Sequence, residues 1–186
     1  DLIVRGTGDP TINTRNGRAT AVFDEWTAAL HAAGISAIDG RIIGNDQAFD
    51  DEGLGAGWAW DYLEAGYAAP VGALEFNEDT ATLTVTPAPS PGEAPIVALM
   101  AGSGYELLNK ATTGPAGSRE TIGYRRHSER AVLEVDGSIP AGAAAINRTV
   151  AVVNPTSFFA QGLKDALVAR GITVSGPAVD FDDVAQ

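Results

Sequence analysis

The chain has 186 residues, of which 45% are hydrophobic and 19% charged, so it can bury a sizeable core and is too apolar to be disordered. Its formal net charge of -12 would repel a phosphate backbone, and we therefore predict no nucleic-acid partner. The sequence has no cysteine, which excludes disulfides and thiolate metal ligands, and no apolar run of roughly 18 residues that would predict a membrane span.

The chain opens with a short apolar strand, Leu2 to Arg5, which leads into a turn at residues 6 to 10 that holds two glycines and a proline. A strand in this place is unlike a signal peptide. We therefore expect that Asp1 is not the natural start of the protein and that any signal or anchor segment preceded it.

A helix is predicted next, because apolar residues recur every three to four positions and Gly34 follows where a left-handed C-terminal cap belongs. The apolar positions are Val22, Phe23, Trp26, Ala29, Leu30 and Ala33. Residues 35 to 43 then have the composition of a strand. Residues 80 to 86 alternate as a strand does, until the proline-rich segment 87 to 92 ends it.

Beyond that break the pattern predicts a small β-rich region of short strands. The expected strands cover residues 96–99, 105–108, 119–125 and 130–135.

A strand and a second helix are predicted near the C-terminus. The strand covers residues 149–153, and the helix covers residues 158–170, with Asn154 as its N-cap and Pro155 in the first turn. Gly171 is expected to end this helix.

The two predicted helices share a pattern of spacing. The corresponding positions are Trp26, Leu30, Gly34 and Ile35 in the first helix, and Leu163, Leu167, Gly171 and Ile172 in the second. The match suggests two similar strand-helix-strand units, although a helix followed by glycine and a strand is also a common pattern. We predict a mixed α/β (α+β) fold, with an outer domain of residues 1–86 and 147–186 and an inserted β-rich subdomain of residues 87–146.

The sequence lacks the motifs of a serine acyl-transfer enzyme of the penicillin-binding type. Such an enzyme needs a serine three residues before a lysine, yet the only lysines, Lys110 and Lys164, follow Leu107 and Gln161 at that spacing. Neither lysine begins a Lys-Thr-Gly triplet, and no serine has an asparagine two residues later. We therefore assign no catalytic residue to this chain.

No metal site or cofactor is predicted either. The two histidines, His31 and His127, lack the pair spacing of a zinc site, and a surface or capping role is favoured for both. An acidic group could attract calcium, but its spacing fits no EF-hand loop, and a solvated charged turn is favoured. This group consists of Asp46, Asp50, Asp51 and Glu52.

One segment, residues 57–70, concentrates two of the three tryptophans and two of the four tyrosines beside a carboxylate. Aromatic rings with one anion suit an aliphatic ammonium group or a sugar face. Composition alone favours another interpretation, an aromatic plug between two subdomains. We call residues 58–67 the aromatic loop.

The sequence resembles the class C low-molecular-mass penicillin-binding proteins, which are DacB-type D-Ala-D-Ala carboxypeptidases and endopeptidases. Four stretches match in order: LIVRGTGDPT, AALHAAGISAIDGRIIGNDQAF, GWAWDYLEAGYAAPVGALEFNED and AVVNPTSFFAQGLKDALVARGITVSG. Residues 90 to 130 match least. The resemblance implies that this chain is the non-catalytic insert that splits the catalytic domain of such an enzyme, outside the cytoplasm.

The resemblance also implies the site residues. In the family, an aspartate and a tyrosine of the aromatic loop are thought to contact the side-chain ammonium of the peptidoglycan stem peptide, and Tyr67 matches that tyrosine. The usual loop has Trp-Asp-Asp where this chain has Trp60-Asp61-Tyr62, so Tyr62 replaces the expected aspartate and Asp61 is its nearest substitute. The predicted substrate-binding residues are therefore Asp61, Tyr62 and Tyr67, and β-lactams would bind only through the absent catalytic domain.

Two alternatives stay open at this point. The chain could be a freestanding envelope module that binds peptidoglycan or a protein partner through the aromatic loop. It could also be a structural spacer, in which case substitutions in the loop would change stability and leave substrate preference unaltered.

Overall fold

The computed structural model of the chain describes residues 1–127 and 129–184, which form two compact units. The first unit contains residues 1–55, 70–79 and the described chain from Asn154 onward. The second unit contains residues 56–69 and 80–153. The aromatic loop therefore belongs to the second unit.

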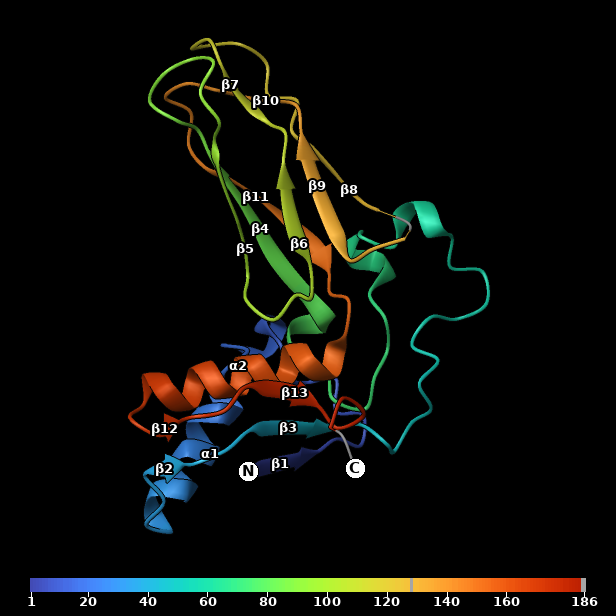
Figure 1. Cartoon of the computed structure of the whole chain (residues 1–186), viewed down its shortest axis with the longest axis vertical. Helices are drawn as coiled ribbons and strands as arrows, with labels where there is room; N and C mark the ends of the chain where they lie inside the picture. The colour runs from blue at the N-terminus through green and yellow to red at the C-terminus, as the bar shows by residue number, and fades with distance from the viewer. Residues whose placement is uncertain (128, 185–186) are drawn as a thin grey trace. The chain divides into compact units, whose positions relative to one another are not determined.

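The first unit is built on a parallel sheet. Its strands have the order β1 (Leu2–Arg5), β3 (Ile42–Asn45) and β13 (Ala178–Asp180), with β3 in the centre (Figure 1). A second parallel pair joins β2 (Ala37–Ile38) to β12 (Thr173–Val174).

The predicted strand over residues 35–43 is therefore divided into two, β2 and the start of β3. The break falls at Gly40, where the chain of the second pair approaches closely, since the Gly176 N–H donates to the Gly40 carbonyl at 2.8 Å. A Cβ on Gly176 would lie only 2.5 Å from that carbonyl oxygen, so the two backbones can meet here only with glycine.

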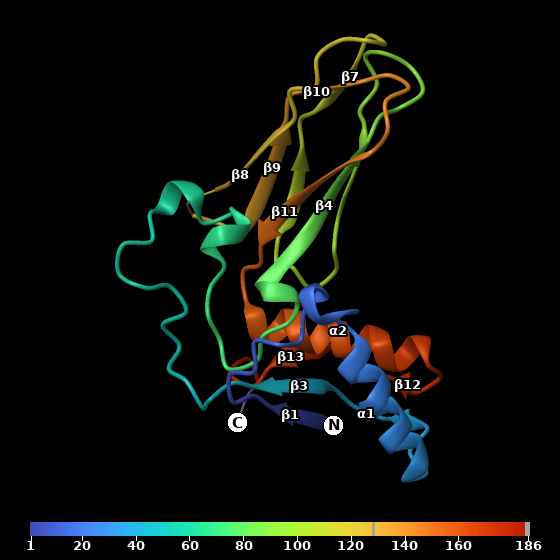
Figure 2. The same ribbon diagram turned by 180° about the vertical axis from the view of Figure 1, so that it is seen from behind.

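Two helices, α1 (Ala21–Ala32) and α2 (Pro155–Ala169), pack against each other in this unit, and α2 also packs on β3 and β13 (Figure 2). As predicted, the Asn154 side chain caps α2, accepting from the Ser157 N–H, and Pro155 lies in its first turn. Gly34 and Gly171 have positive φ angles of 78° and 87° at the helix ends.

The two segments with matching spacing adopt the same local geometry. Past the end of α1 the Ile35 N–H donates to the Leu30 carbonyl at 2.9 Å, and past α2 the Ile172 N–H donates to the Leu167 carbonyl at 3.0 Å. This is the six-to-one bond of a Schellman cap. The short strands that follow, β2 and β12, are hydrogen-bonded to each other.

The core of the first unit is aromatic. Phe23, Phe76, Phe158 and Phe159 are each at most 1% exposed, and the Phe23 ring centroid lies 5.3 Å from those of Phe76 and Phe159. Burying one such ring stabilises the fold by roughly 1.5–3 kcal/mol relative to leaving it exposed.

The second unit consists of short strands in several sheets. In one three-stranded sheet, β4 (Thr80–Thr86) pairs antiparallel with both β5 (Ile96–Leu99) and β11 (Ile146–Ala151). In another, β9 (Val132–Asp136) pairs parallel with β6 (Glu106–Asn109) and antiparallel with β8 (Gly123–Arg126). A third sheet pairs β7 (Thr112–Gly114) with β10 (Ser138–Pro140).

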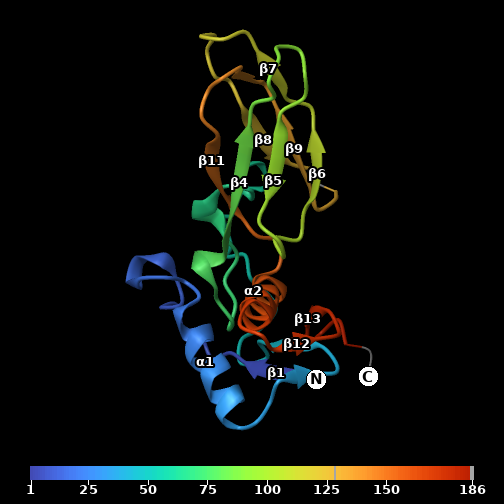
Figure 3. The same cartoon turned by 90° about the vertical axis from the view of Figure 1, so that its left-hand side faces the viewer.

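All three sheets contribute side chains to one apolar core. Figure 3 shows the strands of this unit from the side. Its buried members are Leu83, Val85, Ala111, Ile122, Leu133, Val135, Ile139 and Val150. The core is thus aliphatic rather than aromatic, and the alternation along β4 places Leu83 and Val85 on the buried face.

The predicted mixed α/β class is confirmed, with both helices in the first unit and a β-rich second unit. The predicted strand at residues 119–125 begins later, since β8 covers Gly123–Arg126, and just before it the Ile122 N–H donates to the Glu120 carboxylate at 2.5 Å instead of to a neighbouring strand. In the described part of the chain, no helix is long and apolar enough to cross a membrane.

Candidate functional site

The aromatic loop is fixed to the second unit at its C-terminal half. The Ala151 N–H donates to the Glu64 carbonyl at 2.9 Å, and Ala65 forms an isolated bridge with Val150. A Cβ on Gly66 would lie 2.8 Å from the Thr149 methyl group, so this glycine lets the loop approach β11 closely. Two short 3-10 turns shape the loop, one before these contacts at Trp60–Tyr62 and one at their end, Gly66–Ala68.

The structure brings two of the three predicted site residues together. The ring centroids of Tyr62 and Tyr67 lie 5.7 Å apart with their planes tilted by 47°. The Tyr62 hydroxyl donates to the Gly57 carbonyl at 3.0 Å, so its ring is held in place. The Tyr67 side chain is 80% exposed and is free to meet a ligand.

Asp61 lies beside this pair in sequence and is exposed. Among the described residues it has neither a hydrogen-bond nor an ion-pair partner. Its carboxylate is therefore available to a cation from solvent, and the neighbouring tyrosine rings supply apolar surface for the aliphatic part of such a ligand. This arrangement suits an alkyl ammonium group.

The loop also exposes two indole rings, with Trp58 41% and Trp60 73% exposed. Trp60 borders a pocket of about 340 Å³ in the second unit, at strands β8 and β9. We call it the basic pocket, and its lining consists of Trp60, Arg125, Arg126, His127, Glu129, Arg130 and Glu134. The sequence favoured a surface or capping role for His127 and did not predict a pocket at these residues. The feature of the sequence that could have indicated this pocket is the run of basic residues from Arg125 to His127 in an otherwise acidic chain.

Glu134 is the buried anchor of this pocket, since it is 2% exposed. It accepts hydrogen bonds from Lys110 Nζ at 2.8 Å, from Arg125 and from His127 Nε2 at 3.1 Å. The Lys110 hydrogen bond lowers the pKa of Glu134 most, and His127 and the nearby positive charges lower it further, against the opposing effect of burial. The carboxylate therefore stays ionised and holds three basic side chains in position.

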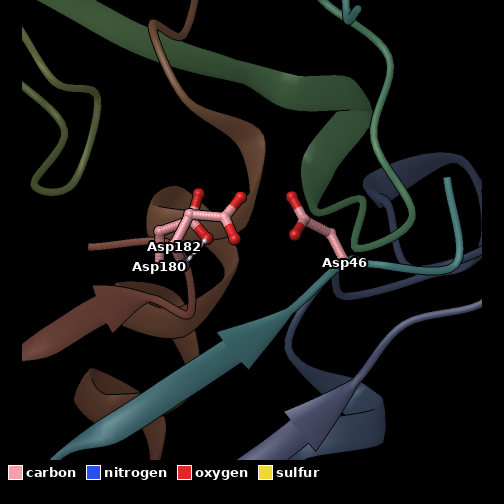
Figure 4. A group of neighbouring side chains, drawn as sticks. All are labelled: Asp46, Asp180 and Asp182. Atoms are coloured by element: carbon pink, nitrogen blue, oxygen red, sulfur yellow. Dashed lines mark hydrogen bonds between the residues drawn. The ribbon is translucent and has the colours of Figure 1, made fainter. Parts of the chain in front are cut away.

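A second charged cluster lies in the first unit, at the carboxyl ends of the parallel strands β3 and β13. Carboxylate oxygens of Asp46, Asp180 and Asp182 lie within 4.8 Å of one another, and Figure 4 shows the Asp46 carboxylate facing the other two. Asp180 is 6% exposed, and burial raises its pKa against the lowering effect of the Asn154 hydrogen bond. Asp46 accepts from the Thr156 hydroxyl, and its other oxygen, Oδ1, is buried without a partner among the described residues.

This acidic trio shares only Asp46 with the acidic group that the sequence suggested as a calcium site. Asp50, Asp51 and Glu52 are exposed, as predicted for a solvated turn, but Asp46 is drawn away to residues more than 130 positions later. Oxygen ligands at this spacing are suited to a hard cation. Acidic clusters are also common in proteins that bind no ion, so the trio by itself does not define a site.

Comparison with known proteins identifies relatives along almost the whole chain. Residues 1–184 match the family described as the D-Ala-D-Ala carboxypeptidase 3 (S13) family. A D-alanyl-D-alanine carboxypeptidase from Actinomadura sp. (strain R39) is 33% identical over 183 residues, which is 95% of this chain and 33% of that protein. The chain thus spans about a third of the length of that relative.

Two solved structures have a similar fold. Penicillin binding protein 4 (dacB) from Haemophilus influenzae matches 99% of this chain and 40% of its own, with a TM-score of 0.68 and 20% identity. The same protein in complex with a β-lactam matches with a TM-score of 0.57 and 17% identity.

Proposed function

Because the chain belongs to the D-Ala-D-Ala carboxypeptidase 3 (S13) family, we propose that it is the non-catalytic insert of a penicillin-binding serine carboxypeptidase or endopeptidase. The share of the relatives that it spans, 33% and 40%, supports an insert, as does the lack of all three serine-enzyme motifs in its sequence. Its role is to wall the cleft that receives the peptidoglycan stem peptide. We place the parent protein outside the cytoplasm, where that substrate is found.

The observation that carries this proposal is the exposed Tyr67 ring beside Tyr62 and the unpaired Asp61 carboxylate. An ammonium group on the substrate side chain is attracted both by a carboxylate and by the negative faces of aromatic rings. Such a contact orients the peptide without taking part in bond making. The loop therefore selects the stem peptide by the amine on its side chain.

Acylation belongs to the rest of the parent enzyme in this proposal. A serine there attacks the carbonyl between the two D-alanines, a lysine takes its proton, D-alanine leaves, and water then hydrolyses the acyl-enzyme. β-Lactams acylate the same serine. Residues 1–186 alone are expected neither to hydrolyse the peptide nor to bind penicillin covalently.

The first experiment compares labelling by a fluorescent penicillin in the full-length parent and in this chain. Labelling of the parent alone supports the insert. Labelling of the isolated chain would contradict the proposal, and labelling of neither would favour the alternative, a freestanding envelope module whose exposed Trp60 and Tyr67 rings bind peptidoglycan or a protein.

The second experiment tests the loop in the full-length parent. Tyr67→Ala and Asp61→Asn should each lower kcat/KM about tenfold for a stem peptide with a free side-chain amine, and leave a peptide with an acetylated amine almost unchanged. Asp51→Asn removes a similarly exposed carboxylate outside the loop and is the matched control. Equal losses on both peptides, or a change in stability alone, would favour the structural spacer.

A further inference from the structure

The basic pocket is unusual in so acidic a chain, whose formal net charge is -12. Three of its seven lining residues are arginines, and Lys110 lies next to it on Glu134. Positive charge is therefore gathered at one place on the second unit, where it would raise the local concentration of an anion.

The arginines of the pocket differ in whether a carboxylate already forms an ion pair with them. Arg125 pairs with Glu134 and lies 3.6 Å from Asp136, so its charge is already balanced. Arg126 and Arg130 form no ion pair within residues 1–127 and 129–184; the Arg126 guanidinium instead lies over the Tyr105 ring, 5.9 Å from its centroid. Two guanidinium groups are thus available to an anion.

The carboxylates of the pocket leave room for such an anion. Glu134 is 97% buried at its side chain and is neutralised by the groups around it, so it presents little negative charge to the hollow. Glu129 is the one exposed carboxylate among the lining residues. Arg126 and Arg130 therefore outnumber the exposed acid, and a guanidinium can grip carboxylate or phosphate oxygens with two parallel hydrogen bonds.

Trp60 adds an apolar surface to the charged pocket. Its indole is 73% exposed and forms part of the wall, where it offers a flat apolar face beside the charged groups. The C–H groups on one side of a sugar ring form an apolar patch that packs on such a face. A simple inorganic anion has no apolar patch and gains nothing from contact with the indole. A pocket of about 340 Å³ is at the small end of ligand sites, and so it suits one or two sugar rings.

We propose that the basic pocket binds a saccharide that carries an anionic substituent, either a carboxylate or a phosphate. The sugar ring packs on Trp60, and the anion is held by Arg126 and Arg130. Glu134 lines the pocket too, and its hydrogen bonds hold Arg125 and His127 in position. This site is separate from the ammonium contact of Tyr67, and it does not depend on the proposed function.

Calorimetric titration of the purified chain with four probes tests the proposal: glucuronate, glucose 6-phosphate, glucose and inorganic phosphate. At least one of the two anionic sugars should bind about tenfold or more tightly than both glucose and phosphate, and binding should weaken in high salt. Whether glucuronate or glucose 6-phosphate binds more tightly shows whether the pocket prefers a carboxylate or a phosphate.

Variants locate the binding. Trp60→Ala and Arg130→Ala should each weaken it about tenfold or more, and Arg126→Lys, which keeps the charge but loses the planar fork, should weaken it to a smaller extent. Trp58→Ala and Arg119→Ala are matched controls, since both residues are exposed in the second unit outside the pocket lining, and neither should change the affinity. Circular dichroism confirms that each variant is folded.

Three results would overturn the proposal: no binding of any probe to the folded chain, phosphate binding that equals that of the sugars and survives Trp60→Ala, or glucose binding that survives Arg130→Ala. None of these results bears on penicillin labelling of the full-length parent, so the two proposals can fail separately.

Discussion

The pKa of a buried carboxylate is raised in the first unit and lowered in the second. In the first unit, Asp79 is 3% exposed and has no basic side chain among the groups that set its pKa, so burial raises that pKa to about 7. In the second unit, Glu134 is 2% exposed but is surrounded by Lys110, Arg125 and His127, and its pKa is lowered. Burial alone therefore does not decide ionisation, because the neighbouring charge does.

This difference gives the two units opposite responses to pH. A carboxylate whose pKa is raised by folding stabilises the protein below its unfolded pKa and loses that contribution as the pH rises through the folded value. A carboxylate whose pKa is lowered contributes above its unfolded pKa and loses that contribution as the pH falls. Mild acid should thus favour the buried acids of the first unit and weaken the Glu134 cluster.

The largest expected effect tests the difference between the two cores. Phe159→Ala should destabilise the first unit by about 3–5 kcal/mol, because it leaves a cavity beside Phe23 and Trp26. Urea unfolding is followed by Trp26 fluorescence in a background with Trp58→Phe and Trp60→Phe. A loss below about 1 kcal/mol would contradict the idea that the aromatic cluster holds this unit together.

Asp79→Asn tests the unpaired acid. Asparagine keeps the oxygen that accepts the Phe76 N–H and tolerates the positive φ of 50° at this position. It should stabilise the chain by on the order of 3 kcal/mol at pH 8 and remove most of the decline in stability between pH 4 and 7. Urea denaturation across this range measures both, with Asp51→Asn as an exposed control; an unchanged pH slope would refute the assignment.

Glu134→Gln tests the paired acid. The variant should be less stable than the parent chain at pH 7, because Lys110 and Arg125 lose their anion, and the difference should shrink as the pH falls through the lowered pKa of Glu134. The matched control is Glu129→Gln, an exposed acid of the same pocket. A difference that grows on acidification would show that the pKa of Glu134 is not lowered.

The smallest effect concerns the cap of α2. Asn154 accepts from the Ser157 N–H and also donates to Asp180 at 2.8 Å. Asn154→Ala should cost about 1 kcal/mol and raise the pKa of Asp180 further, since that hydrogen bond lowers it. Thermal unfolding and carboxyl NMR titration measure the two changes, and Asn154→Ser separates them, because a serine can still cap the helix but lacks the amide donor and adds no charge beside Asp180.

Much of the local structure followed from the sequence. The predicted bounds of β1, β4 and β5 coincide with those observed, and Gly34, Gly171 and Asn154 lie at the helix ends where they were expected. These features depend on short-range rules, such as the alternation of a half-buried strand or the need for glycine at positive φ. The three-residue strands β7 and β10 escaped prediction because each is too short to show a period.

The candidate sites also differ in whether their residues are close together in the sequence. The aromatic loop was visible in the sequence because its residues are contiguous, whereas the basic pocket joins Trp60 to β8 and β9 across more than 60 positions. The acidic trio was missed for the same reason, since Asp46 meets Asp180 only through the pairing of β3 with β13. The roles of Asp61, Tyr62 and Tyr67 as substrate contacts stay predictions.

For this protein the sequence by itself determined the helices, their caps, most strands, the mixed α/β class and the family, because each depends on residues near one another in the chain or on a matching order of segments. Only the tertiary structure decided which charges meet. It surrounded Glu134 with three basic groups, whereas no basic side chain in the described part of the chain shifts the pKa of Asp79, because strand pairing and helix packing bring distant residues together without regard to their separation in sequence.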